Sequence, residues 1–206
     1  MRMNAKNMDD VLKKAVEALQ EGKIVLHPTE TCYGLAVDPT NEEGLKALYG
    51  MKKMENEKPL SILVSSLDMA DKYGLFSDYA ESIVEKFWPG PVSIIVMRRQ
   101  GGLPEFFNPG HQFISIRYSS DPFTMKMVRM LGRPIVTTSA NLSGKPACYS
   151  VPDLKKQFGV RRYGNLGFVV DSGKIPENPP STIVKIVGDT TVFVRGDGSE
   201  MGGMMR

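Results

Sequence analysis

Residues 24–48, IVLHPTETCYGLAVDPTNEEGLKAL, place an unusual density of polar side chains at the end of an apolar run. The apolar run KIVLH, residues 23–27, is typical of a buried strand, and it stops at a His-Pro pair. Two threonines, a glutamate and a tyrosine follow before a helical pattern begins. Polar residues after a strand are most often turn formers or helix caps, but binding sites also collect at strand ends. The stretch therefore raises a chemical question as well as a folding one.

Outward from this stretch, the chain alternates irregularly between helical and extended patterns. Val11, Ala15 and Leu19 recur at helical spacing after an Asp pair, and Gly22 stands where such a helix would end. Further helices are predicted over residues 41–53 (capped by Thr40 or Asn41), 67–74, 77–88, 121–132 and 151–159. Further strands are predicted over residues 59–66, 92–99, 113–119, 133–144 (running into a polar loop), 166–173, 181–188 and 190–196.

This order of elements predicts the fold class. Strands and helices alternate, yet the strands cluster late in the chain, which favours an α/β fold with α+β character and a mixed, twisted sheet. No linker rich in proline and glycine divides the chain. We therefore expect a single domain over residues 1–206, with a loose Gly- and Met-rich tail over about 198–206.

Composition excludes several classes of protein. Hydrophobic residues make up 41% of the 206 residues and charged residues 24%, which are ordinary globular values. The formal net charge of +3 permits an anionic ligand without demonstrating one. Cys32 and Cys148 are too few for a disulfide framework, which favours a reducing compartment. No apolar run approaches the roughly 20 residues that span a bilayer, and no export signal precedes the first helix. The expected location is the cytoplasm, with no membrane partner.

Four groups of polar residues are crowded against the end of an apolar strand and are candidates for a site. They are residues 29–33, the lysines Lys52, Lys53 and Lys58, residues 137–145, and the PPSTIV segment together with Arg195. Arg117 is the most unusual single charge, because its neighbours along the strand are apolar.

Each of these features also has an ordinary structural explanation. The threonines and serines are most often caps, and the lysines a solvated helix end that complements the helix dipole. Arg117 is explained equally well as a residue of an edge strand with its head in water. Cys32 is better explained as a small packing residue than as a nucleophile, because no histidine lies in its immediate sequence neighbourhood. His27 and His111 are too few for a metal cluster.

Standard catalytic signatures are absent from the sequence. It contains no G-x-G-x-x-G, no G-x-x-x-x-G-K-[ST] and no G-x-S-x-G, which leaves little support for a Ser-His-Asp hydrolase. Hydroxyls, amides and cations at strand ends remain. Such groups suit anions, either carboxylate or phosphate.

Taken together, these segments resemble the YrdC/YciO family. The matching blocks, in order, are PTETCYGLAVDPTN, WPGPVSIIV, ISIRYS, TTSANLSGKP, and PSTIVKI followed by VFVRGDG. The resemblance covers roughly residues 23–198. It implies a twisted open sheet flanked by helices around a positively charged concave cavity.

The resemblance also implies a reaction. L-threonine, bicarbonate and ATP with Mg²⁺ yield threonylcarbamoyl-AMP and pyrophosphate, by a nucleotidyl transfer that uses no catalytic residue beyond positioning and charge neutralisation. The implied partners are tRNA or double-stranded RNA and the proteins that transfer the group to tRNA. No resident metal site is expected.

The resemblance assigns roles to nine side chains. Four are implied to surround L-threonine: Thr31, Arg117, Thr137 and Ser181. Five are implied to bind ATP: Lys52, Lys58, Ser139, Asn141 and Arg195. The guanidinium of Arg117 would match the substrate carboxylate bidentately.

Two positions depart from the family pattern. The K-x-R element reads Lys52-Lys53-Met54 here, so methionine replaces an arginine implied to lie near phosphates. Leu63 stands where some members carry a histidine near the threonine site. Two other functions stay open: an RNA- or nucleotide-binding paralogue without synthase activity, and a hydrolase of a carbamoyl or acyl adenylate. Five cations lining one cavity (Lys52, Lys53, Lys58, Arg117 and Arg195) would suit a synthase or a binding protein.

Overall fold

The structure, a computed structural model, describes residues 1–55 and 58–196. Its helices are α1 (Met8–Gln20), α2 (Glu42–Lys52), α3 (Leu67–Asp71), α4 (Asp78–Phe87), α5 (Pro122–Leu131) and α6 (Val151–Tyr163). Its strands are β1 (Val25–His27), β2 (Gly34–Val37), β3 (Ser61–Val64), β4 (Gly74–Leu75), β5 (Val92–Arg98), β6 (Phe113–Tyr118), β7 (Ile135–Ser139), β8 (Phe168–Val169), β9 (Thr182–Val187) and β10 (Thr190–Arg195). The tail predicted to be loose, about residues 198–206, lies outside the described residues.

The described strands form one open, ten-stranded mixed sheet. The strand order is β10-β9-β5-β6-β3-β7-β2-β1-β8, and β4 pairs with β5 beside this path. Three neighbouring pairs are parallel (β1 with β8, β3 with β6, and β5 with β9), and the others are antiparallel. The predicted mixed α/β sheet is confirmed.

Helix termini follow local capping chemistry. The Asn41 side chain accepts a hydrogen bond from the Gly44 amide at 2.8 Å, so Asn41 rather than Thr40 caps α2. Asp121 caps α5 in the same way, and Gly132 ends that helix at a φ of +76°, where glycine is favoured. No helix in the described part of the chain combines the length and apolarity needed to cross a membrane.

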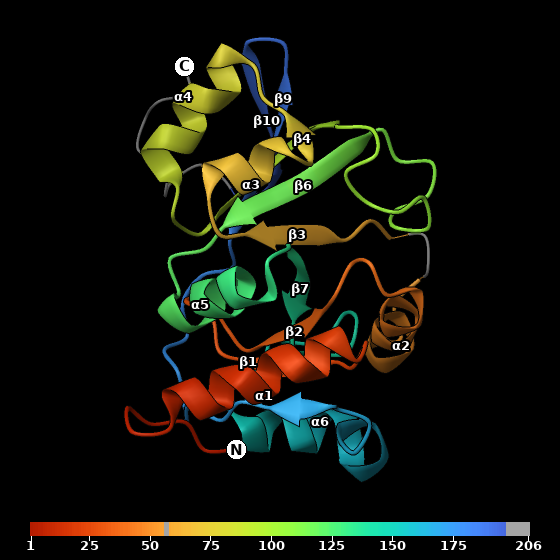
Figure 1. The fold of residues 1–206 in the computed structure, drawn as a ribbon, viewed down its shortest axis with the longest axis vertical. Helices are drawn as coiled ribbons and strands as arrows, with labels where there is room; N and C mark the ends of the chain where they lie inside the picture. Colours follow the sequence, from red (N-terminus) through yellow and green to blue (C-terminus); the bar gives the residue numbers. More distant parts are fainter. Residues whose placement is uncertain (56–57, 197–206) are drawn as a thin grey trace.

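The two faces of the sheet pack against different helices. Successive residues of a strand point to opposite faces. Ile62 and Val136 therefore belong to the main core with α2, α4 and α6, whereas Leu63 and Ile135 belong to a second core under α1 and α5. Figure 1 shows α1 and α5 side by side over the β1, β2 and β7 part of the sheet. Neither helix extends over β5, β9 or β10 (Figure 1).

Several sequence predictions need correction. The short strands β2 and β4 were not predicted, because the polar residues before β2 read as a loop leading to the next helix. The strand predicted over residues 166–173 is only two residues long. The helix predicted over 151–159 continues to Tyr163, although Gly159 interrupts it at a φ of +71°. The edge-strand explanation of Arg117 is wrong, because β6 lies between β5 and β3.

Candidate ligand-binding site

One row of side chains crosses five neighbouring strands on the face that carries Leu63. The row consists of Leu63, Arg117, Ser93, Ile183 and Arg195, each paired with the next. Directly paired residues point to the same face of a sheet. The strand register therefore brings two arginines that are 78 positions apart in the sequence onto one surface.

A β-bulge places the second arginine in this row. The ladder between β9 and β10 shifts register between Phe193 and Arg195. A regular ladder would set Val194 opposite Ile183, and the extra residue sets Arg195 there instead. Bulges re-aim side chains in this way at functional sites.

The row forms one wall of a cavity of about 510 Å³. The cavity is also lined by the β1–β2 connection, the end of β7 and the end of α2. All nine side chains predicted to bind ligand line it: Thr31, Lys52, Lys58, Arg117, Thr137, Ser139, Asn141, Ser181 and Arg195. Their placement together is an observation, whereas their individual roles remain proposals.

The lining is positively charged. Lys52, Lys58, Arg117 and Arg195 line the cavity, and no aspartate or glutamate of the described residues does. Lys53, the fifth predicted cation, is exposed and is not part of the lining, which corrects the prediction. Among the described residues no cluster of His, Cys, Asp and Glu could hold a metal ion. The cavity is therefore suited to an anionic ligand.

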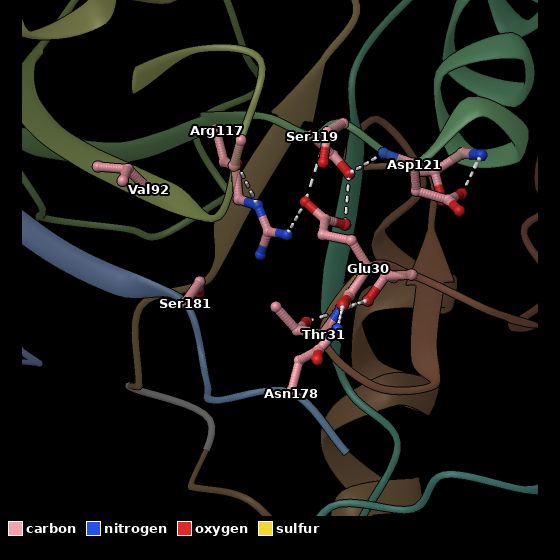
Figure 2. A network of polar contacts seen from close by, with 12 residues as sticks. Glu30, Thr31, Val92, Arg117, Ser119, Asp121, Asn178 and Ser181 are labelled. Atoms are coloured by element: carbon pink, nitrogen blue, oxygen red, sulfur yellow. Dashed lines mark hydrogen bonds and ion pairs between the residues drawn. The ribbon is translucent and has the colours of Figure 1, made fainter. Parts of the chain in front are cut away.

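Arg117 is held by an ion pair inside the protein. It is 8% exposed, its Nε donates to the Gly90 carbonyl at 3.2 Å, and its Nη2 binds the carboxylate of Glu30. Its Nη1 has no hydrogen-bond partner among the described residues, and Figure 2 shows this nitrogen pointing away from Glu30 toward the side where Thr31 and Ser181 lie. Nη1 is therefore the terminal nitrogen left entirely for a ligand, and the predicted bidentate contact, which stays a prediction, would have to share Nη2 with Glu30.

Glu30 is the main residue that sequence reasoning missed. Its Oε2 accepts from Ser119 at 2.7 Å, and its backbone carbonyl accepts from Asn178 at 2.7 Å (Figure 2). Burial alone would raise the pKa of Glu30, but the charge of Arg117 and the Ser119 hydrogen bond outweigh burial and lower the pKa. Glu30 therefore stays ionised and fixes the orientation of Arg117. Its place among the polar residues of the PTET motif was the available signal, because a buried arginine needs an acidic partner and Glu30 is the acid of that motif.

Arg195 and Ser181 form a second fixed unit. The Nε of Arg195 donates to the Ser181 carbonyl at 2.8 Å, and its Nη2 donates to Ser181 Oγ at 2.6 Å. The residue predicted for phosphate and the residue predicted for threonine therefore touch each other. The two predicted subsites meet at this contact.

Lys52 holds a loop rather than extending freely into the cavity. Its ammonium binds the carbonyl of Ser139 and donates to the carbonyl and Oδ1 of Asn141 at 2.9 and 3.0 Å. An ammonium has three donors, so all of them have partners within residues 139–141, the S-A-N loop. Burial lowers the pKa of Lys52 to about 8. Lys52 is not the solvated helix end that the ordinary explanation expected, and it acts on a ligand through charge and through the loop.

The remaining candidates have structural surroundings that limit their chemistry. Met54 and Leu63 line the cavity, so both departures from the family pattern lie at the site itself. Burial raises the pKa of Cys32, so little of it is thiolate near neutral pH. This agrees with the prediction that Cys32 is a packing residue and not a nucleophile. His27 is fully buried and binds Thr124 and Thr137, not a metal ligand set.

Comparison with known proteins now identifies the relationship. The model of the Sua5, YciO and YrdC family, described as "Telomere recombination", matches residues 17–196. The chain belongs to this family. The cavity, the cross-strand row and the S-A-N loop all lie within the matched residues.

Individual relatives support this membership. A relative from Methanocaldococcus jannaschii is 33% identical over 193 residues, covering 94% of this chain and 88% of that protein. The threonylcarbamoyl-AMP synthase of Aliivibrio fischeri is 30% identical over 177 residues, covering 84% of this chain and 92% of that protein. The structure of Sua5 from Pyrococcus abyssi complexed with L-threonine superposes with a TM-score of 0.83 at 26% identity. The match covers 95% of this family member and 56% of that chain, so this chain spans about half the length of Sua5.

Proposed function

We propose that this protein makes threonylcarbamoyl-AMP from L-threonine, bicarbonate and ATP, and releases pyrophosphate. The observation that carries the proposal is a single basic cavity that gathers all nine side chains the family pattern assigns to threonine and ATP. Similarity to the Aliivibrio fischeri synthase over most of both chains supports the activity. Similarity to a Sua5 structure containing L-threonine supports the amino-acid substrate.

The chemistry needs no covalent intermediate with the protein. The amine of threonine adds to bicarbonate and forms a carbamate with loss of water. A carbamate oxygen then attacks the α-phosphorus of ATP, forming the new P–O bond, while the bond to pyrophosphate breaks. Catalysis rests on holding the two reactants together and on neutralising charge, which a rigid basic cavity supplies.

Threonine would bind beside the cross-strand row. The free Nη1 of Arg117 would take its carboxylate as a single charge-assisted hydrogen bond, with Glu30 keeping the guanidinium in place. Thr31, Thr137 and Ser181 supply hydroxyls around the same space.

ATP would occupy the other part of the cavity. The S-A-N loop, fixed by Lys52, would meet the nucleotide, and Arg195 and Lys58 would face phosphates. Magnesium would arrive with ATP, held by its phosphates, because no carboxylate of the described residues lines the cavity. The resulting adenylate would serve tRNA modification together with partner proteins.

A pyrophosphate-release assay tests the proposal. Release from ATP is expected only when threonine and bicarbonate are both present, and omission of either should abolish it. RNA binding with a strong salt dependence and no pyrophosphate release would instead identify a binding protein on the same fold. Pyrophosphate release without threonine would indicate hydrolysis of ATP itself and would also refute the synthase.

A further inference from the structure

His27 joins the threonine side of the cavity to the core. The ring is fully buried at the end of β1, between α5 and β7. Its Nε2 lies 3.1 Å from Thr137 Oγ, and its Nδ1 lies 2.9 Å from the Pro28 carbonyl and 3.1 Å from Thr124 Oγ. None of the nine roles that the family resemblance assigns falls on this histidine.

The surroundings of Nδ1 decide which ring nitrogen carries the proton. A carbonyl oxygen only accepts, so an unprotonated Nδ1 would set its lone pair against the Pro28 oxygen. Thr124 also donates to that carbonyl, at 3.2 Å, which turns the lone pairs of Thr124 toward Nδ1. Both neighbours therefore accept, and Nδ1 donates. Burial lowers the pKa of His27 to about 4, so the ring carries a single proton at neutral pH.

The protonation of Nδ1 decides the polarity of the Thr137 hydroxyl, that is, whether it donates a hydrogen bond to His27 or accepts one. With the proton on Nδ1, Nε2 has only a lone pair, so Thr137 donates its one hydrogen to Nε2. The lone pairs of Thr137, a half-buried residue of the cavity lining, are then left for the cavity.

We propose that His27 is a positioning residue that makes Thr137 a hydrogen-bond acceptor toward the ligand, so that the site selects a group with an N–H donor at this point. If the amino-acid substrate of the proposed function is correct, that group is the α-amine. An amine that donates N–H to Thr137 keeps its own lone pair free to attack bicarbonate. This inference about the ligand rests on the proposed function, whereas the polarity of Thr137 does not.

The chain around Gly34 is shaped to allow this contact. Gly34 pairs with His27 across β1 and β2, and a Cβ there would lie 2.9 Å from Thr137 Oγ and 3.0 Å from His27 Nε2. Both distances are shorter than ordinary contacts, so any side chain at this position would press on the hydrogen bond itself.

The first test measures the tautomer in the free protein. The chain has two histidines, so a ¹⁵N–¹H spectrum of the imidazoles contains two ring systems, and a His111→Gln variant assigns them. His27 is expected to carry its proton on Nδ1 at neutral pH. A proton on Nε2 would overturn the proposal, whatever the protein binds.

The second test measures L-threonine and ATP binding to two variants. In His27→Phe, Thr137 loses its acceptor, so L-threonine affinity should fall about tenfold while ATP affinity is unchanged. In His27→Gln, the amide oxygen replaces Nε2 as acceptor and should restore most of that affinity. Equal losses in both variants would overturn the ligand-selecting role. Nδ1 protonation with no L-threonine binding in the wild type would uphold the polarity of Thr137 and refute the proposed function.

Discussion

At the scale of single residues, the main finding is that the ligand-facing groups are committed to in-chain partners before any ligand binds. Arg117 has two of its three nitrogens occupied, and Lys52 has all three donors occupied. A ligand therefore meets groups already held in one orientation. This lowers the entropy lost on binding, which is the physical basis of preorganisation.

The Arg117–Glu30 pair gives a prediction that separates binding from folding. Arg117→Ala should abolish threonine-dependent pyrophosphate release, and it should destabilise the fold by about 3–5 kcal/mol, because it leaves a mostly buried carboxylate unpaired. Adding Glu30→Gln should recover much of the stability without restoring turnover. Urea unfolding and the pyrophosphate assay measure the two effects. Near-normal turnover in either variant would refute the carboxylate-binding role of Arg117.

His27 makes stability depend on pH. Its pKa is about 4 in the folded protein against 6.5 for an unperturbed histidine. Between these two pH values the imidazole is therefore protonated in the unfolded chain and neutral in the folded protein. The contribution of neutral His27 to the free energy of unfolding is complete above pH 6.5. It declines by about 3 kcal/mol in total as the pH falls toward 4. The difference in unfolding free energy between wild type and His27→Gln, measured from pH 7 to pH 4, should shift by this amount. A His111→Gln control should track the wild type; identical pH dependence in all three proteins would contradict the prediction.

At the scale of elements, the end of α2 and the end of β7 act together. Lys52 ends the helix, and the S-A-N loop begins at the last residue of β7. The Lys52 side chain links helix and loop by hydrogen bonds, and the Ser143 amide donates to the Lys52 carbonyl at 2.8 Å. Helix and loop are therefore one structural unit, on the side of the cavity that we propose binds the nucleotide.

This unit predicts the effect of replacing Lys52. Lys52→Met keeps most of the buried volume but removes the three donors, so the loop should lose its fixed position. The KM for ATP should rise about tenfold or more, with the affinity for L-threonine nearly unchanged. Lys53→Met is the matched control, because Lys53 is exposed and does not line the cavity. Equal effects on both substrates would show that Lys52 acts on the whole cavity rather than on the loop.

At the scale of the whole molecule, the basic character of the cavity is a sum over distant elements. Its four lining cations come from α2, the segment after it, β6 and β10. Met54 lies in the same lining without a charge. The family pattern places an arginine there, so the charge of the cavity is one unit lower than that pattern implies.

Restoring the arginine tests whether this difference matters. Met54→Arg should strengthen ATP binding about ten- to one-hundredfold, as expected for one charge-assisted hydrogen bond of about 1.5–3 kcal/mol. Lys53→Arg places a guanidinium next door, outside the lining, and should leave ATP affinity unchanged. Calorimetric titration with ATP compares the three proteins. No gain in Met54→Arg would mean that Lys58 and Arg195 already neutralise the phosphates.

The sequence by itself determined the fold class, most of the helices and strands, and nine of the residues that line the cavity. Helical spacing, strand-forming runs and capping residues act over a few positions, so they can be read locally, and the family blocks supplied the nine site residues. The short strands β2 and β4 escaped because runs of four and two residues carry too weak a periodicity.

Only the tertiary structure decided what each of those residues touches. Three sets of contacts join positions 87 or more apart in the sequence. They are the ion pair of Glu30 with Arg117, the hydrogen bond between Thr137 and His27, and the three hydrogen bonds of Lys52. The strand order of the sheet and the packing of loops and helices against it create these contacts, and no local pattern encodes which elements become neighbours. The HPTET stretch therefore showed that polar groups gather at a strand end. The packing of β6, β7 and α5 against this stretch determined which of those groups bind Arg117, which bind the Thr137 side chain and which face the cavity.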